Sequence, residues 1–145
     1  MKDLFLTFSE AQAVTAAAAS TNVIDLRAAR QMAPGKDLWF NIHCVVAMTD
    51  AGSDSTLIVT AETSTTAGGS YTTRQTIGTF PAVSAIGAMI KTPIAVFGTA
   101  ERFLRLTYTP GAGGNLSTGS FTAYLSTAPQ EATIYPSGFT FAAVP

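Results

Sequence analysis

Apolar and polar side chains alternate over several stretches of the chain, and clusters of Gly, Pro, Asn, Asp and Ser separate these stretches. The longest alternation runs from Leu38 to Met48, with Trp39 and His43 among the intervening positions. Because successive side chains of a strand point to opposite faces of a sheet, one set should lie in the core and the other should face outward. The set predicted to lie in the core is Leu38, Phe40, Ile42, Cys44, Val46 and Met48.

Other segments also have strand character, which brings the expected number to about eight strands. These segments are Leu4–Phe8, Val23–Leu26, Leu57–Thr63, Tyr71–Phe80, Ile90–Phe97, Phe103–Tyr108 and Ser120–Ser126. Short strands separated by turns predict an all-β fold, an antiparallel two-sheet β-sandwich. Eight strands favour a jelly roll over an immunoglobulin-like sandwich, while the strand order stays open. Pro93 marks an edge strand or a bulge, because proline cannot donate to a sheet.

Two regions, about 9–33 and about 128–145, carry apolar residues without clear alternation. Within the first, the Ala-rich stretch Glu10–Ala19 is the one plausible helix, with Ser9 as its N-cap. We expect a single domain over residues 1–145, in which these two regions either close the ends of the sandwich or form an interface with a neighbouring protein.

Charge is unusually low, because Asp, Glu, Lys and Arg make up 12% of the residues, against roughly 25% in an average soluble protein. The net charge is -1. Proteins close to neutrality tend to associate, so we expect much of the surface to be covered by other subunits. The basic residues are scattered, which argues against direct nucleic-acid binding. No apolar run approaches the roughly 18 residues of a membrane helix, so we expect no membrane partner.

Candidate chemistry is sparse. The single histidine, His43, and the single cysteine, Cys44, should face opposite sides of one strand, so they do not form a metal site. Cys44 is expected to be a buried, inert thiol. The segment Asp50–Asp54 could hold a hard cation or form a turn, and the turn is the simpler interpretation. We expect no cofactor, no metal and no enzymatic activity.

The segment from Phe8 to Thr15, followed by alanines and then by Ser20–Leu26, resembles the opening of a known protein family. That family comprises the capsid cement, or decoration, proteins of short-tailed phages, known best from a Bordetella phage. The resemblance is specific across residues 4 to 26 and general elsewhere. It implies a jelly roll that forms a homodimer, although a trimer stays open. It also implies binding to the major capsid protein on the outer surface of the virion, where the protein stabilises the shell against packaged DNA. The resemblance brings no catalytic residues with it.

Aromatic and arginine side chains are the usual anchors of interfaces, and six of them stand out here. They are Arg27, Arg30, Trp39, Tyr135, Phe139 and Phe141. Trp39 is either an interface anchor or packs under a terminal arm of its own chain. Arg27 and Arg30 are either anchors or solvated loop residues.

Two other functions are compatible with a jelly roll. A carbohydrate- or host-surface-binding module would stack sugars on outward aromatic residues, for which Trp39 and Tyr124 are candidates. A cupin-like metalloenzyme would need a cluster of histidines, and the chain has one.

Overall fold

The structure is a computed structural model that describes residues 6–27, 38–95 and 101–127. Within these residues the protein has nine strands and no α-helix. The strands are β1 (Thr7–Ala13), β2 (Ala18–Ala19), β3 (Ile24–Asp25), β4 (Trp39–Thr49), β5 (Leu57–Ser64), β6 (Thr72–Phe80), β7 (Met89–Pro93), β8 (Phe103–Pro110) and β9 (Thr118–Ser126). The described part of the chain contains no helix with the length and apolar character needed to cross a membrane.

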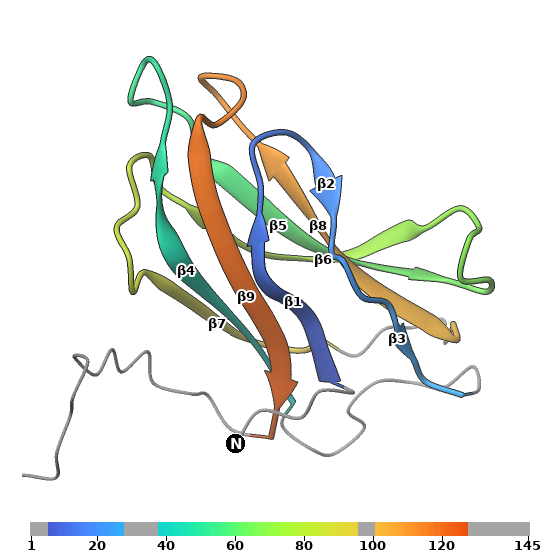
Figure 1. Cartoon of the computed structure of the whole chain (residues 1–145). Coiled ribbons are helices and arrows are strands. Elements are labelled where there is room, and N and C mark those ends of the chain that lie inside the picture. Colours follow the sequence, from blue (N-terminus) through green and yellow to red (C-terminus); the bar gives the residue numbers. More distant parts are fainter. Residues whose placement is uncertain (1–5, 28–37, 96–100, 128–145) are drawn as a thin grey trace, which may run out of the picture.

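The strands form two antiparallel sheets that pack face to face (Figure 1). One sheet has the order β1-β9-β4-β7, and the other has the order β2-β8-β5-β6. The short strand β3 also pairs with β8, so β2 and β3 are two pieces of one edge strand. Counted in this way, the described residues form eight strands in the order of a jelly roll. The sequence pattern predicts this fold but leaves the strand order open.

The core lies between the sheets and follows the predicted alternation. In β5 and β8 every second side chain is fully buried, and the same applies to most of β9. The inward residues are Leu57, Val59 and Ala61 in β5, Leu104, Leu106 and Tyr108 in β8, and Phe121, Ala123 and Leu125 in β9. Pro93 lies in β7 at the edge of its sheet, which confirms the expectation for that proline.

The predicted helix over Glu10–Ala19 is wrong, because this stretch contains the end of β1, a turn and β2. Ser9 does not cap a helix, since its hydroxyl contacts Tyr108 Oη at 2.9 Å and donates to Gln12 Oε1 at 2.8 Å. Pairing of β1 with β9 overrides the helix preference of the alanines. The first strand also begins later than expected, at Thr7, and continues to Ala13.

Val46 is also a correction, because 46% of its surface is exposed while Cys44 and Met48 are 1% exposed. The register between β4 and β9 shifts between Cys44 and Val46 and again before Thr49. Such a bulge adds a residue to one strand and re-aims its side chain, which explains why Val46 leaves the core. The Cys44 thiol is buried, as expected, and burial raises its pKa.

The loops at one end of the jelly roll are joined by backbone hydrogen bonds. The Leu116 amide donates to Thr15 O at 2.8 Å, and the Ser117 amide donates to Thr49 O at 2.6 Å. In the β4–β5 loop, Asp50 Oδ2 accepts from the amides of Gly52 and Asp54, at 3.1 and 3.3 Å. Burial acts to raise the pKa of Asp50, but hydrogen bonds from backbone amides outweigh it and lower the pKa. The carboxylate therefore shapes the turn that the sequence indicates.

Two neighbouring glycines give a test of this interlocked end. Gly113 and Gly114 have φ angles of +93° and +92°, so a side chain strains either position. A Cβ at Gly113 would also lie 2.7 Å from Ser55 N, whereas a Cβ at Gly114 meets nothing within 4 Å. We expect Gly114→Ala to lower the free energy of unfolding by about 1–2 kcal/mol. Gly113→Ala should lower it by about 1–3 kcal/mol more, because the loops must separate. Urea denaturation measures both, and equal losses would contradict tight packing between these loops.

Candidate interaction surface

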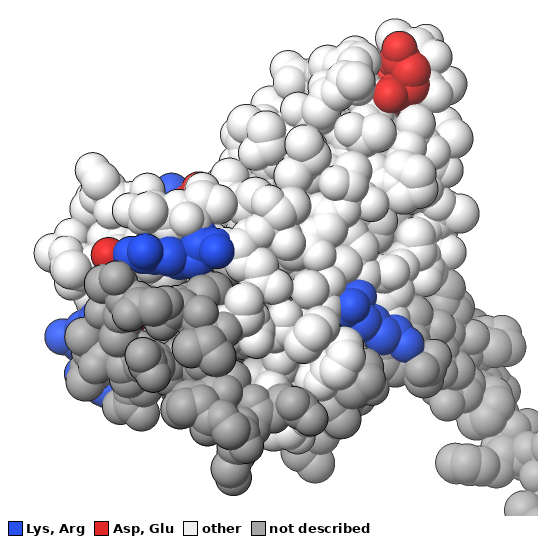
Figure 2. Space-filling model, turned by 180° about the vertical axis from the view of Figure 1, so that it is seen from behind, with Lys and Arg blue, Asp and Glu red and all other residues white. Residues whose placement is uncertain are grey.

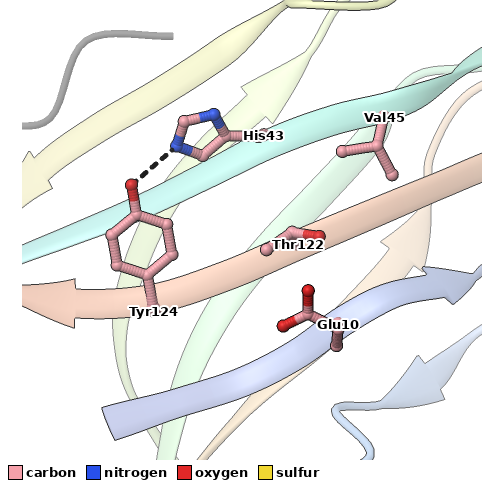
Figure 3. A pocket seen from close by; sticks show the side chains of 5 residues that line it. All are labelled: Glu10, His43, Val45, Thr122 and Tyr124. Atoms are coloured by element: carbon pink, nitrogen blue, oxygen red, sulfur yellow. Dashed lines mark hydrogen bonds between the residues drawn. The ribbon is translucent and has the colours of Figure 1, made fainter. Parts of the chain in front are cut away.

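A shallow hollow lies on the outer face of the β1-β9-β4-β7 sheet (Figure 3). It is lined by Glu10 from β1, by His43 and Val45 from β4, and by Thr122 and Tyr124 from β9. Strand register brings them together, since His43 lies opposite Thr122. The hollow has a volume of about 240 Å³, below the roughly 300–1,000 Å³ of typical small-molecule sites. Its size and openness suit a contact with another protein's side chain better than a bound small molecule.

His43 and Tyr124 form a stacked pair in this hollow. His43 Nε2 and Tyr124 Oη are 3.0 Å apart, and the ring centroids are 5.5 Å apart with an interplanar angle of 22°. Only 9% of the Tyr124 surface is exposed, and burial raises the pKa of its hydroxyl. His43 faces outward, as predicted, and its imidazole is used to hold Tyr124.

Of the other lining residues, Val45 is apolar, and the polar side chains of Glu10 and Thr122 do not complete a metal-ligand set. Glu10 is exposed, and Thr122 Oγ1 accepts a hydrogen bond from the Ala11 amide at 2.9 Å. In the part of the chain that the structure describes, His, Cys, Asp and Glu side chains do not gather in groups of three. What the hollow can do chemically is accept and donate hydrogen bonds at the centre of a sheet face.

Of the six predicted interface residues, the structure describes Trp39 and Arg27. Trp39 is partly buried at the start of β4, in register with Pro93 and Ser126. Arg27 is exposed, with a φ of 69°, and its amide donates to Asp25 Oδ1 at 2.8 Å. Trp39 begins β4, whereas Arg27 follows β3, which pairs with β8 in the other sheet. Their interface roles stay predictions.

The other four interface candidates lie outside the described residues. They are Arg30, Tyr135, Phe139 and Phe141.

Among the residues that the structure describes, charged side chains gather at one end of the β8-β5-β6 sheet and form three ion pairs there. The paired residues are Asp25 and Arg102 at 2.8 Å, Glu62 and Arg105 at 2.9 Å, and Arg74 and Glu101 at 2.9 Å. Arg102 holds the pKa of Asp25 well below its usual range. Seen from behind, charges occupy a few separate places and most of the described surface is uncharged (Figure 2). Low charge in the sequence thus becomes a broad uncharged surface in the fold.

Sequence reasoning missed three exposed apolar residues, Val46, Val83 and Ile86, whose segments are joined by backbone hydrogen bonds. The alternation over Leu38–Met48 predicts that Val46 lies in the core, and the stretch between the predicted strands Tyr71–Phe80 and Ile90–Phe97 carries no prediction. A usable signal was present, because residues 81–88 include Val83 and Ile86 but no charged side chain. Loops normally carry polar residues to meet solvent, so an uncharged loop with large apolar residues is a candidate contact.

Comparison with known proteins places this jelly roll in a family. No curated protein sequence matches the chain. A family model named Bbp16 matches residues 8–125, which cover the sandwich from the start of β1 to near the end of β9. The name points to a protein of a Bordetella phage, in agreement with the resemblance found at the N-terminal segment. The chain therefore belongs to the Bbp16 family.

Proposed function

We propose that the protein is a structural, non-enzymatic virion component that binds the outer surface of a phage capsid as an oligomer. There it joins neighbouring subunits of the major capsid protein and stabilises the shell against the pressure of packaged DNA. The observation that carries the proposal is the match to a phage protein family across nearly the whole jelly roll. The N-terminal resemblance to capsid cement proteins supplies the more specific role.

The surface supports this proposal. A protein that acts alone in solution needs charge to stay dispersed, and this one carries 12% charged residues. A protein held in a shell does not need that protection, because its neighbours cover part of its surface. Many copies on one particle also make modest individual contacts sufficient, since linked binding events reinforce one another.

The direct test is co-sedimentation of the purified protein with capsids stripped of their decoration, with the disruption temperature of the particles followed in parallel. Saturable binding that raises the disruption temperature is the expected result. Absence of saturable binding at micromolar protein, with the protein shown to be folded, would contradict the cement role. Binding without any gain in particle stability would contradict stabilisation while leaving attachment in place.

Trp39 is the described aromatic residue that we expect to matter most for assembly. We expect Trp39→Ala to weaken capsid binding or oligomerisation by roughly tenfold or more, as for a truncated aromatic anchor. The melting temperature of the monomer should change less. Tyr71→Ala is the matched control, because Tyr71 is a partly buried aromatic on the other sheet, where Arg105 covers its ring at 3.8 Å. Unchanged binding and oligomer mass in Trp39→Ala would contradict its role as an anchor.

A carbohydrate-binding module is less well supported by the geometry. Sugars stack on open aromatic faces, but Tyr124 is stacked on His43 and is 9% exposed. The second aromatic candidate, Trp39, is partly buried. A glycan array tests this alternative, and saturable binding to a defined sugar would favour it over the cement role.

A further inference from the structure

The loop between β6 and β7 lies beside β4, where it continues the β7 side of that strand (Figure 1). The Gly87 amide donates to Cys44 O and the Cys44 amide donates to Ala88 O, at 2.9 and 2.8 Å. Further along, the Met48 amide donates to Ser84 O at 2.9 Å. These bonds fix residues 84–88 beside residues 44–48, so the exposed residues of the two segments are neighbours.

Three large apolar side chains are exposed at this place, and we call Val46, Val83 and Ile86 the β6–β7 patch. Their exposed fractions are 46%, 55% and 58%. Among the described residues, Val23 at 38% is the other large apolar side chain that is exposed, and it lies before β3 on the other sheet. Neither residues 44–49 nor residues 81–88 include a charged side chain. Exposed apolar residues are ordinary when scattered singly, whereas a group of them in one place is a candidate contact surface.

The backbone pays a conformational cost to display this patch. Val83 has a φ of 53°, which is a genuine outlier for a β-branched residue. Ser84 Oγ donates to Pro81 O at 2.6 Å, and the Ala88 amide donates to Ala85 O at 3.1 Å, so the turn is held in this strained form. Strained residues that the surrounding structure holds in place are concentrated at functional sites.

Val46 reaches the patch through a second irregularity, the bulge in β4. Without the register shift, alternation would send its side chain into the core beside Cys44 and Met48. A strained turn and a bulge, in segments that are far apart in the sequence, thus direct apolar side chains to one place. Both are fixed by hydrogen bonds before any partner binds, which lowers the ordering cost of association.

We propose that the β6–β7 patch is the surface that docks on the capsid shell, against an apolar, uncharged surface of the major capsid protein. The inference rests on the proposed function and names the contact that carries it. The patch has no charged side chain. A charged group of the partner would therefore lose its hydration on binding without gaining an ion-pair partner. Three side chains also bury far less area than a standard protein interface, which buries about 800 Å² on each partner. A second copy of the chain held by this patch alone would not form a stable dimer, whereas a shell that offers many equivalent sites makes a small contact sufficient.

The test compares Val83→Asp and Ile86→Asp with the control Val23→Asp in the co-sedimentation assay, with oligomer mass measured by light scattering. We expect at least tenfold weaker shell binding for the two patch variants, because each would bury an unpaired carboxylate. Shell binding by Val23→Asp should be little changed. All three variants should keep the oligomer mass and the melting temperature of the wild-type protein. Aspartate tolerates a positive φ better than valine does, so Val83→Asp should fold. Ile86→Asp tests the same contact at a residue without a positive φ.

Each outcome separates the docking surface from the function on which it rests. If the wild-type protein fails to bind stripped shells, the cement role fails and the docking surface with it. If the wild-type protein binds and the patch variants bind equally well, the cement role stands and the docking surface is wrong. If the patch variants lose oligomer mass, the patch joins copies of this chain, and the shell is not its occupant.

Discussion

Replacing Phe121 with alanine is expected to lower the free energy of unfolding by about 3–5 kcal/mol, the usual cost of removing a buried phenylalanine ring. Phe121 is fully buried and comes from β9, in the β1-β9-β4-β7 sheet. Its ring lies 5.1 Å from that of Phe80 and 5.9 Å from that of Tyr108, both of which belong to the opposite sheet. The ring therefore joins the two sheets, and its loss leaves a cavity that neither sheet can fill alone.

Thermal and urea denaturation measure this loss, which corresponds to a fall in melting temperature of about 10–16 °C for a chain of this size. Phe103→Ala is the matched control. Phe103 is partly exposed on β8, and its ring contacts the Arg102 guanidinium at 5.0 Å, so its removal should cost on the order of 1 kcal/mol. Similar losses for the two variants would contradict a bridging role for Phe121.

The same strand links stability to binding. Phe121 points into the core, while Thr122 and Tyr124 line the hollow on the outer face. Weakening the core around Phe121 should therefore also loosen the sheet that carries the hollow and β4. For this reason a binding assay on a core variant is informative only at temperatures well below its melting temperature.

The sandwich could be predicted from the sequence where one face of a strand is buried and the other is not. Leu57–Ser64 and Phe103–Pro110 pair along their whole lengths, with Leu57 opposite Pro110 and Ser64 opposite Phe103. Each follows the two-residue period because its inward residues meet the opposite sheet. In a strand with one buried face, every second residue meets the same apolar environment, so the alternation in the sequence is enough to identify the strand.

The continuation of the first strand to Ala13 could not be predicted in the same way, because this part of β1 is recognisable only by its pairing with β9, which is distant in the sequence. Thr7 lies opposite Tyr124 and Ala13 lies opposite Ser120, with two register shifts between them. No residue pattern near Glu10–Ala19 indicates that pairing, and alanine has a high intrinsic helix propensity. The pairing of β1 with β9, which is distant in the sequence, overrides the helix propensity of this segment.

Val46 and Val83 show why the candidate docking surface was not apparent in the sequence. The outward direction of Val46 depends on a bulge, and a bulge depends on the register with β9. The exposure of Val83 depends on a positive φ that valine rarely adopts. The lack of charge over residues 81–88 could be read in advance, but the pairing of that loop with β4 could not.

Tyr108 is expected to make the protein sensitive to alkali. Its side chain is fully buried in β8, and burial raises the pKa of its hydroxyl from 10.0 to about 12, although the hydrogen bond with Ser9 acts in the opposite direction. The unfolded chain releases this proton from about pH 10, while the folded protein keeps it until about pH 12. Between these values the unfolded state binds fewer protons, so the free energy of unfolding falls as the pH rises. The stability that this group contributes is complete below pH 10 and is lost by pH 12.

Tyr108→Phe isolates that contribution. At neutral pH the variant should lose about 1 kcal/mol for the hydrogen bond with Ser9, whose hydroxyl keeps its bond to Gln12. Between pH 10 and 12 the wild-type protein should lose about 2–3 kcal/mol more than the variant, because a shift of two pKa units is worth about that much. Tyr71 and Tyr124 titrate in both proteins, so their effects cancel in the difference. Urea denaturation at each pH gives the two curves, and parallel curves up to pH 12 would contradict a buried, protonated Tyr108.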